Sequence, residues 1–413
     1  MIRIRRPAFY GWVIVVGCFV AMLCMGEVMW SFGVFFKALQ AEFGWSRSVT
    51  SSCYTFMVIG YAISAIVAGR LSDRYSARPV LLASALIAGS AIALCSQIET
   101  VFQLQGLLFA AGLGAGVLLS VPSSMVQRWF HNRPRSAIAL AVVMSGVGVG
   151  ALVFAPVINY IIATMGWRPA FMIAGLFFFV AVMFAAIVIR PAPIPSFTPY
   201  SGAETQEAHG SIARQLVRTP RFIALVAVMM ASVFSFQVLS VHLVPLATDT
   251  GISPEVAAAA LGLAGAFSVI GRLVCGLVSG RLGWRWALAL AEIGIGVAVL
   301  FLLLVDEVWM LYCFVGLYGV AQGVRAVSVS GVIGSLFGMR AIGELIGTVM
   351  ACAQLAAAFG PYLAGYLHDV LGSYTLILWT IGISLVVCAV VVLRFLVAPL
   401  ERNAITEEPT PGV

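Results

Sequence analysis

Long apolar runs separated by short polar stretches dominate the chain. Twelve of them are about 20 residues or longer, the length that an α-helix needs to cross a hydrocarbon core of ~30 Å. Continuous runs favour helices, because strands of a membrane β-barrel would alternate apolar and polar residues over about ten positions. The pattern predicts an all-α membrane protein with transmembrane helices at residues 9–36, 48–70, 79–97, 100–125, 136–162, 168–190, 220–248, 255–280, 284–304, 307–337, 343–367 and 373–397.

One polar stretch of real length, "PAPIPSFTPYSGAETQEAHGSIARQLVRT", divides these runs into six and six. It is rich in Pro, Ser and charge, which is typical of a linker. We therefore expect an N-terminal six-helix bundle at residues 1–190, a cytoplasmic linker at 191–219, a C-terminal six-helix bundle at 220–397 and a cytoplasmic tail at 398–413.

The two halves share short motifs at a constant offset of 207 residues. Three matches at one offset indicate a duplication. Parallel repeats of this kind are related by an axis along the membrane normal, with a substrate site near the midplane between them and alternating access by rocking of the halves. The matching pairs are "GRLSDR" (69–74) with "GLVSGR" (276–281), "GVLLSVPSSMVQRWF" (116–130) with "GVRAVSVSGVIGSLF" (323–337), and Gly44 and Ser46 with Gly251 and Ser253.

Composition and charge agree with a membrane protein. Apolar residues make up 62% of the chain and charged residues 9%, against about 25% charged residues in ordinary soluble domains. The net charge of +7 follows from topology, since the cations outside the runs gather on the side of the N-terminus, with Lys37, Arg47 and Arg168 as the exceptions. This positive-inside bias places both termini in the cytoplasm, removes the need for a nucleic-acid partner, and predicts a multi-pass protein of the cell's inner (plasma) membrane.

Several other features argue against a cleaved signal peptide and against enzymatic catalysis. The 8 cysteines lie within the runs without CxxC spacing, as packing residues do. The N-terminal "MIRIRRPAFYGW" lacks a small-residue cleavage site after a short apolar core, so the first run is expected to be retained. The 4 histidines are scattered, and no nucleophile motif or phosphate loop is present. We expect no metal, no cofactor and no enzymatic activity.

A motif after the second run carries a family resemblance. "GRLSDRYSARP" (69–79) is similar to the loop 2–3 signature of the major facilitator superfamily, Gly-x-Leu-x-Asp-Arg-x-Gly-Arg-Arg/Lys, with Ser76 in place of the second Gly. "YGWVIVVGCF", "VFFKALQAEFGWSRS" and "QRWFHNRPRSAIALAVVMSGVGVG" resemble its monocarboxylate porter and oxalate/formate antiporter branch. The resemblance implies the major facilitator fold of twelve helices and a monomeric secondary transporter of small organic anions in the lipid bilayer.

The signature also implies a cytoplasmic gate of Gly69, Asp73, Arg74 and Arg78. Asp73 can cap a helix or pair with an arginine and so hold one conformation. The second-half copy has Gly280 in its place, so the gate is expected to be asymmetric. The alternative is that the positive charges of this loop merely set the topology.

Arg272 lies inside the eighth run, eight residues before Gly280, or about 12 Å at helical rise. An ionisable residue at that depth costs ~2.5–3.5 kcal/mol on insertion scales and marks a site by default. In the resembled family, an arginine followed four residues later by Gly, as in "GRLVCG", holds the substrate carboxylate. A guanidinium suits that role because it is a permanent, bidentate donor. The alternative is an arginine whose head snorkels to the headgroups.

The chain departs from that family at three positions. Ser268 stands where animal monocarboxylate porters usually have an aspartate, and Trp30 aligns with their lysine of span one. In span eleven, "GTVMACAQLAAAFGPYLAG" has no counterpart of the oxalate antiporter's lysine and offers only Gln354 in its place. Trp30 and Gln354 are therefore candidate substrate-binding residues that differ from those of the resembled family.

Arg325 is the second cation inside a run. It lies three residues from Gln322 and seven from Tyr318, the spacing of one helix face. In the resembled superfamily, spans one, four, seven and ten usually line the cavity, so Arg325, Gln322 and Tyr318 become candidate substrate-binding residues. The alternative is a buried structural pair of Arg325 with Glu27 or another acid.

Two residues are candidates for proton coupling. Glu27 could switch protonation when substrate neutralises a nearby arginine, and His242, nearer the outer end of its run, could titrate near physiological pH. His242 could equally be a polar residue at the outer mouth. Glu292 in span nine has no role that the sequence explains.

Together these features predict a secondary transporter of mono- or dicarboxylates, working by proton-coupled symport with protons as the second partner. An anion exchanger of the oxalate/formate type is the alternative. A multidrug exporter of the same superfamily would need acidic and aromatic cavity residues in place of arginines. A transporter-like sensor would bind ligand without moving it, and the chain carries no extra soluble signalling segment.

Overall fold

The apolar runs form helices throughout the described part of the chain. The computed structural model describes residues 10–75, 77–130, 135–190, 218–337 and 342–396, with side chains for all of these except 65–75, 119–120, 136–137, 280 and 342–344. The predicted linker and tail therefore lie almost wholly outside the described residues. No strand occurs in these ranges, which confirms the all-α fold class.

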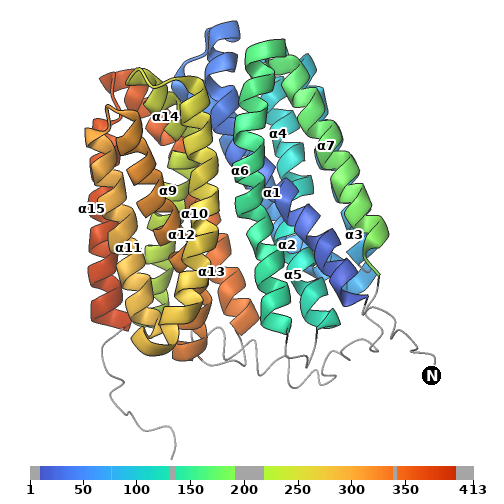
Figure 1. The fold of residues 1–413 in the computed structure, drawn as a ribbon, viewed down its shortest axis with the longest axis vertical. Coiled ribbons are helices and arrows are strands. Elements are labelled where there is room, and N and C mark those ends of the chain that lie inside the picture. Colours follow the sequence, from blue (N-terminus) through green and yellow to red (C-terminus); the bar gives the residue numbers. More distant parts are fainter. Residues whose placement is uncertain (1–9, 76, 131–134, 191–217, 338–341, 397–413) are drawn as a thin grey trace, which may run out of the picture.

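The helices fall into two groups that stand side by side (Figure 1). We call them the N-terminal half and the C-terminal half. The N-terminal half contains α1 (Gly11–Phe43), α2 (Arg47–Tyr75), α3 (Ala77–Leu94), the 3₁₀ turn η1 (Cys95–Gln97), α4 (Val101–Ala115), α5 (Val117–Trp129), α6 (Ser136–Met165) and α7 (Trp167–Val188). The C-terminal half contains α9 (Pro220–Asp249), α10 (Pro254–Leu282), α11 (Trp284–Phe301), η2 (Leu302–Leu304), α12 (Val308–Phe337), α13 (Ile342–Ala357), α14 (Gly360–Leu371), α15 (Thr375–Val391) and the π-helical η3 (Val392–Leu396).

Ten helical segments of the described chain are long and apolar enough to cross a membrane. The predicted runs at 48–70 and 100–125 are not among the ten. They correspond to α2, which begins and ends with polar and charged residues, and to α4 with α5, where α4 alone has 15 residues. At 1.5 Å per residue α4 is about 22 Å long, less than a hydrocarbon core. The count of twelve spans stays a prediction.

The duplicated Gly-x-Ser motif makes the same turn in both halves. Gly44 ends α1 with φ 67°, and Gly251 follows α9 with φ 91°. Both are in the left-handed region that favours glycine. Two residues on, the hydroxyls of Ser46 and Ser253 accept hydrogen bonds from the backbone N–H groups of Val49 and Val256 and so cap α2 and α10. We call the end of the molecule that carries these turns the Gly44 end, and the opposite end the Arg78 end.

The halves meet along α6 and α10, which pack against each other in the middle of the molecule (Figure 1). Glycines allow this close approach, as small residues do between membrane helices. A Cβ added at Gly148 would lie 2.5 Å from the carbonyl oxygen of Gly265. A second contact joins α1 to α9, where a Cβ at Gly33 would lie 2.6 Å from the carbonyl oxygen of Ser240. The halves therefore touch backbone to backbone.

We expect Gly265→Val to disrupt the contact between the halves. A Cβ at Gly265 would lie 2.5 Å from Cβ of Ala151 and 2.9 Å from the carbonyl oxygen of Gly148, so the helices must separate. Overpacking of this kind costs about 1–3 kcal/mol, and the unfolding temperature in detergent should fall by several degrees. Gly276→Val on the same helix is the matched control, because a Cβ at Gly276 meets no atom within 4 Å. An equal fall for both variants would contradict the tight packing.

Candidate anion-binding site

Arg272 of α10 and Arg325 of α12 are brought together by close helix packing. A Cβ at Gly323 would lie 2.0 Å from the carbonyl oxygen of Ser268 and 2.8 Å from the backbone nitrogen of Arg272. The two helices therefore touch within two residues of Arg325, and the two guanidinium groups interact electrostatically. Arg325 is buried, with 9% of its surface exposed, and Arg272 is partly buried.

Arg325 is held by a chain of hydrogen bonds along one face of α12. Its Nε donates to Oε1 of Gln322 at 2.8 Å, and Nε2 of Gln322 donates to the hydroxyl of Tyr318 at 2.8 Å. Among the described residues the Nη atoms of Arg325 make no hydrogen bond. The face expected from the sequence spacing thus fixes the guanidinium while leaving its outer N–H groups for another acceptor.

Arg272 reaches across to the N-terminal half. Its Nη1 donates to the main-chain carbonyl oxygen of Met144 on α6 at 2.6 Å. A carbonyl is a neutral acceptor, whereas a carboxylate carries the opposite charge and can accept two parallel hydrogen bonds from one guanidinium. A carboxylate arriving beside Arg272 can therefore replace this bond, and its arrival would release a contact between the halves.

Within the part of the chain that the structure describes, neither arginine has a carboxylate within 4.0 Å. The acid that interacts with Arg325 electrostatically is Glu292 of α11. Glu292 is fully buried and its Oε1 accepts a hydrogen bond from the hydroxyl of Ser232 at 2.7 Å. Among the described residues this acid interacts with Arg325 and not with Arg272, and buried charges of one sign require compensation. The arrangement can hold an anion between the two guanidiniums.

Glu27 is not brought to the arginines. It projects into a cavity of about 40 Å³ inside the N-terminal half, with Ser31 beside it and apolar walls that include Phe35, Ile92 and Phe171. Both carboxyl oxygens of Glu27 and the hydroxyl of Ser31 are buried without a hydrogen-bond partner. Such a cavity is large enough for a few water molecules, at about 10–15 Å³ each. The structure therefore does not form the Glu27–Arg325 pair considered from the sequence.

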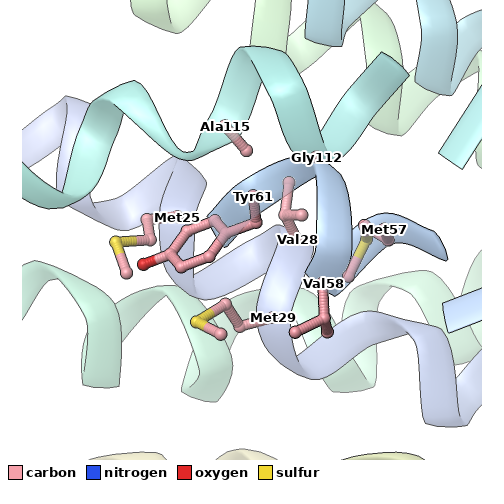
Figure 2. A pocket seen from close by; sticks show the side chains of 8 residues that line it. All are labelled: Met25, Val28, Met29, Met57, Val58, Tyr61, Gly112 and Ala115. Carbon is pink, nitrogen blue, oxygen red and sulfur yellow. The ribbon is translucent and has the colours of Figure 1, made fainter. Parts of the chain in front are cut away.

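A smaller cavity lies beside the first and is apolar. It measures about 10 Å³ and is shown in Figure 2, where the ring of Tyr61 lies beside the side chains of Met25 and Met29. Met57 and Gly112 also line it. The hydroxyl of Tyr61 has no hydrogen-bond partner. A space of one water molecule without a charged wall cannot receive an organic anion.

Trp30 and Gln354 lie on helices that bridge the halves, but no contact joins either to the guanidiniums among the described residues. Trp30 of α1 packs edge-on against Phe236 of α9, with ring centroids 5.1 Å apart. Gln354 belongs to α13, which packs on both α9 and α2, and its Oε1 is buried without a hydrogen-bond partner. Trp30 therefore lies at the contact between the halves, and Gln354 lies on a helix that contacts both.

His242 lies in a hydrogen-bonded network at the Gly44 end. Its Nε2 is 2.9 Å from the carbonyl oxygen of Pro361 and 3.1 Å from the hydroxyl of Ser51, and its Nδ1 is 2.9 Å from the hydroxyl of Tyr374. A carbonyl oxygen only accepts, so Nε2 carries the hydrogen and Nδ1 accepts from Tyr374. These hydrogen bonds join α2, α9 and α14, and a proton-coupling role of His242 stays a prediction.

Ion pairs across the halves extend this network. Asp249 at the end of α9 receives Nζ of Lys37 at 2.8 Å and Nη2 of Arg47 at 2.6 Å. Asp369 of α14 accepts hydrogen bonds from the backbone N–H groups of Arg47 and Ser48, at 3.0 and 2.8 Å, and so caps the start of α2 from the other half. The Gly44 end is therefore closed by contacts between the halves. Among the side chains that the structure describes, no ion pair joins the halves at the Arg78 end.

Sequence reasoning missed this network, although the repeat contained a signal for it. Asp249 corresponds to Glu42 at the repeat offset, so both turns carry an acid. Glu42 pairs with Arg168 of its own half at 2.7 Å, whereas Asp249 pairs across the halves. Which partner each acid takes depends on helix positions that the sequence pattern does not contain.

The signature residues Gly69, Asp73 and Arg74 lie in the last turns of α2, and their side chains are outside the described residues. Arg78, in the first turn of α3, is exposed. The predicted cytoplasmic gate stays a prediction.

Comparison with known proteins gives consistent results along the whole chain. The family model of the Major Facilitator Superfamily matches residues 18–304 and 225–411. Monocarboxylate transporter 12 of Xenopus laevis is 24% identical, over 95% of this chain and 90% of its own length. Monocarboxylate transporter 11 of Homo sapiens is 28% identical, over 89% of this chain and 79% of its own length.

Two solved structures share the fold. A crystal structure of the nucleoside transporter NupG superposes with a TM-score of 0.78 at 11% identity, covering 94% of this chain and 99% of its own. A crystal structure of a D-xylose-proton symporter gives a TM-score of 0.74 at 16% identity, covering 94% of this chain and 98% of its own.

Proposed function

This chain belongs to the Major Facilitator Superfamily of membrane transporters, and from that premise we propose that it is a secondary transporter of small organic anions. Mono- or dicarboxylates are the substrates, and the coupling is symport with protons. The protein works as a monomer in the inner (plasma) membrane with both termini in the cytoplasm. The similarity to monocarboxylate transporters over most of the chain supports the substrate class.

The observation that carries the proposal is the pair of arginines at the contact between the halves. The positive charges of Arg272 and Arg325 are close enough to repel each other. Among the described residues, their guanidiniums donate hydrogen bonds to Met144 and Gln322, which are neutral acceptors. Two guanidiniums can grip the two oxygens of a carboxylate with charge-assisted hydrogen bonds. A neutral substrate would leave the charge of Arg272 without a nearby acid among the described residues.

Alternating access explains why the site lies where it does. With the Arg78 end taken as cytoplasmic, the ion pairs of Asp249 join the halves on the outer side. Substrate that replaces the bond between Arg272 and Met144 loosens a contact between α10 and α6. Binding would thereby bias the rocking of the halves.

A multidrug exporter is disfavoured by the size of the acidic cavity. Glu27 with Phe32, Phe35 and Phe171 has the acidic and aromatic composition that such an exporter needs. The space of about 40 Å³ is far below the 300–1,000 Å³ of pockets for drug-sized molecules.

Uptake into proteoliposomes tests the proposal. We expect the purified protein to accumulate at least one of radiolabelled formate, pyruvate, L-lactate, oxalate and succinate when an inward proton gradient is imposed. Uncoupled equilibration with exchange of preloaded carboxylate would indicate the anion exchanger instead. Failure to move any of the five, while the protein remains monodisperse, would contradict the proposed function.

A further inference from the structure

Glu292 is a buried carboxyl group whose position the anion site does not explain. It lies on α11, is fully buried, and has one oxygen, Oε2, without a hydrogen-bond partner. Its Oε1 accepts from the hydroxyl of Ser232 on α9. An ionised carboxylate in a helix bundle normally has every oxygen satisfied by donors or a cation. A carboxyl group that is half satisfied is able to exist with or without its proton.

The packing of α11 on α12 places Glu292 at the depth of Arg325. The two helices are antiparallel neighbours in the chain, and a Cβ at Gly294 would lie 3.1 Å from Cβ of Ala321. From that contact, Glu292 is two residues and Arg325 four residues toward the Arg78 end. At 1.5 Å per residue their levels differ by about 3 Å. The separation exceeds 4.0 Å, since they form no ion pair, but the charges interact.

We propose that Glu292 is the residue that binds the coupled proton, and that it senses the substrate through Arg325. This inference rests on the proposed function. A substrate carboxylate beside Arg325 and an ionised Glu292 are two negative charges that compete for one guanidinium. Protonation of Glu292, in which one H⁺ adds to the carboxylate to give the neutral acid, removes that competition. By linkage, anion binding favours proton binding to the same extent.

The groups that face Glu292 support a role for it in place of Glu27. They are Arg325 on α12, Ser232 on α9 and Cys388 on α15, and Tyr318 on α12 interacts with Arg325. On α10, Arg272 acts on Arg325. Among the described residues, the cation that interacts with Glu292 is Arg325, which belongs to the anion site. Glu27 has no such partner, because no charged side chain of the described chain interacts with its carboxyl group.

The test separates proton-driven accumulation from exchange, using the five carboxylates named above. In exchange, the transporter changes conformation with a carboxylate bound in both directions and releases no proton. Exchange therefore needs only the anion site. Glu292→Gln keeps the side-chain shape and the oxygen that accepts from Ser232, and it is permanently neutral. We expect it to exchange preloaded for external carboxylate at rates within a fewfold of wild type, while accumulation under a proton gradient falls at least tenfold. The matched control Glu27→Gln should accumulate like wild type.

A second variant covers the case in which Glu292→Gln is inactive in both assays. Ser232→Ala removes the donor to Oε1 but keeps the carboxyl group, so the ionised form loses a hydrogen bond. We expect the midpoint of the pH dependence of uptake to move to higher pH.

Each contrary result has one meaning. Glu292→Gln that accumulates substrate like wild type would overturn the inference and leave the proposed function standing. Loss of exchange in Glu292→Gln with an unmoved pH profile in Ser232→Ala would show a structural role and also overturn it. Absence of any transport by the wild type would overturn the proposed function itself.

Discussion

Arg272→Ala is expected to abolish concentrative carboxylate uptake, and Arg272→Lys to impair it. Charge-assisted hydrogen bonds to a guanidinium are worth about 1.5–3 kcal/mol, so the alanine variant should bind carboxylate roughly ten- to a hundredfold more weakly. Lysine keeps the charge but offers a point charge without the planar fork. It should retain measurable binding with a raised KM. Initial rates of uptake over a range of carboxylate concentrations measure both effects.

The matched control is Arg281→Ala on the same helix. Arg281 is exposed near the Arg78 end of α10, in the last helical turn. Its removal should leave the KM unchanged, because it belongs to the charges that set topology. Unaltered uptake in both Arg272 variants would contradict the anion site. An equal loss of uptake in Arg281→Ala would show that the effect comes from lowering the net positive charge and not from a specific anion site.

Removing the acids that join the halves at the Gly44 end is expected to open that end. In the double variant Asp249→Asn, Asp369→Ala, two ion pairs and the cap on α2 are lost together. Exposed pairs contribute about 0.2–1 kcal/mol each and a helix cap about 1 kcal/mol. The combined effect of about 2 kcal/mol corresponds to a shift of more than tenfold in the ratio of the two conformations.

Spin labels measure this opening directly. Ala41 on α1 and Glu255 on α10 are exposed at the Gly44 end and belong to different halves. With the exposed Cys313 and Cys352 replaced by serine, labels at these two positions should show a longer distance population in the double variant.

The matched control is Glu42→Gln, which breaks the ion pair with Arg168 inside the N-terminal half at the same end. It should leave the distance distribution unchanged. An unchanged distribution in the double variant, or an equal change in Glu42→Gln, would contradict a closing role for the acids of the C-terminal half.

The sequence predicted the helices well because hydrocarbon imposes a simple requirement on length and polarity. It did not predict the breaks within two of the runs. The run at 100–125 divides at Gly116, where a Cβ would lie 2.4 Å from the carbonyl oxygen of Tyr61. The run at 343–367 divides just before Gly360 and Pro361. A close contact with a distant residue accompanies the first break, whereas Pro361 in the first turn of α14 accompanies the second.

The sequence identifies the arginines of the candidate site, but it does not show which buried acid lies near them. Arg272 and Arg325 stand out because a permanent charge in an apolar run needs a reason. Glu27 and Glu292 stand out equally, but their roles depend on which way each helix faces. On α1, Gly26 and Gly33 contact α6 and α9, which turns Glu27 and Ser31 toward the interior of the N-terminal half. On α11, contact at Gly294 turns Glu292 toward Arg325.

A structure of the protein with a bound carboxylate, chosen as the one of the five that is taken up best, tests the central claim most directly. We expect the carboxylate between the guanidiniums of Arg272 and Arg325, with the hydrogen bond from Arg272 to the carbonyl of Met144 replaced. A carboxylate bound elsewhere, for example against Lys37 and Arg47 at the Gly44 end, with both buried guanidiniums still bonded to Met144 and Gln322, would contradict it.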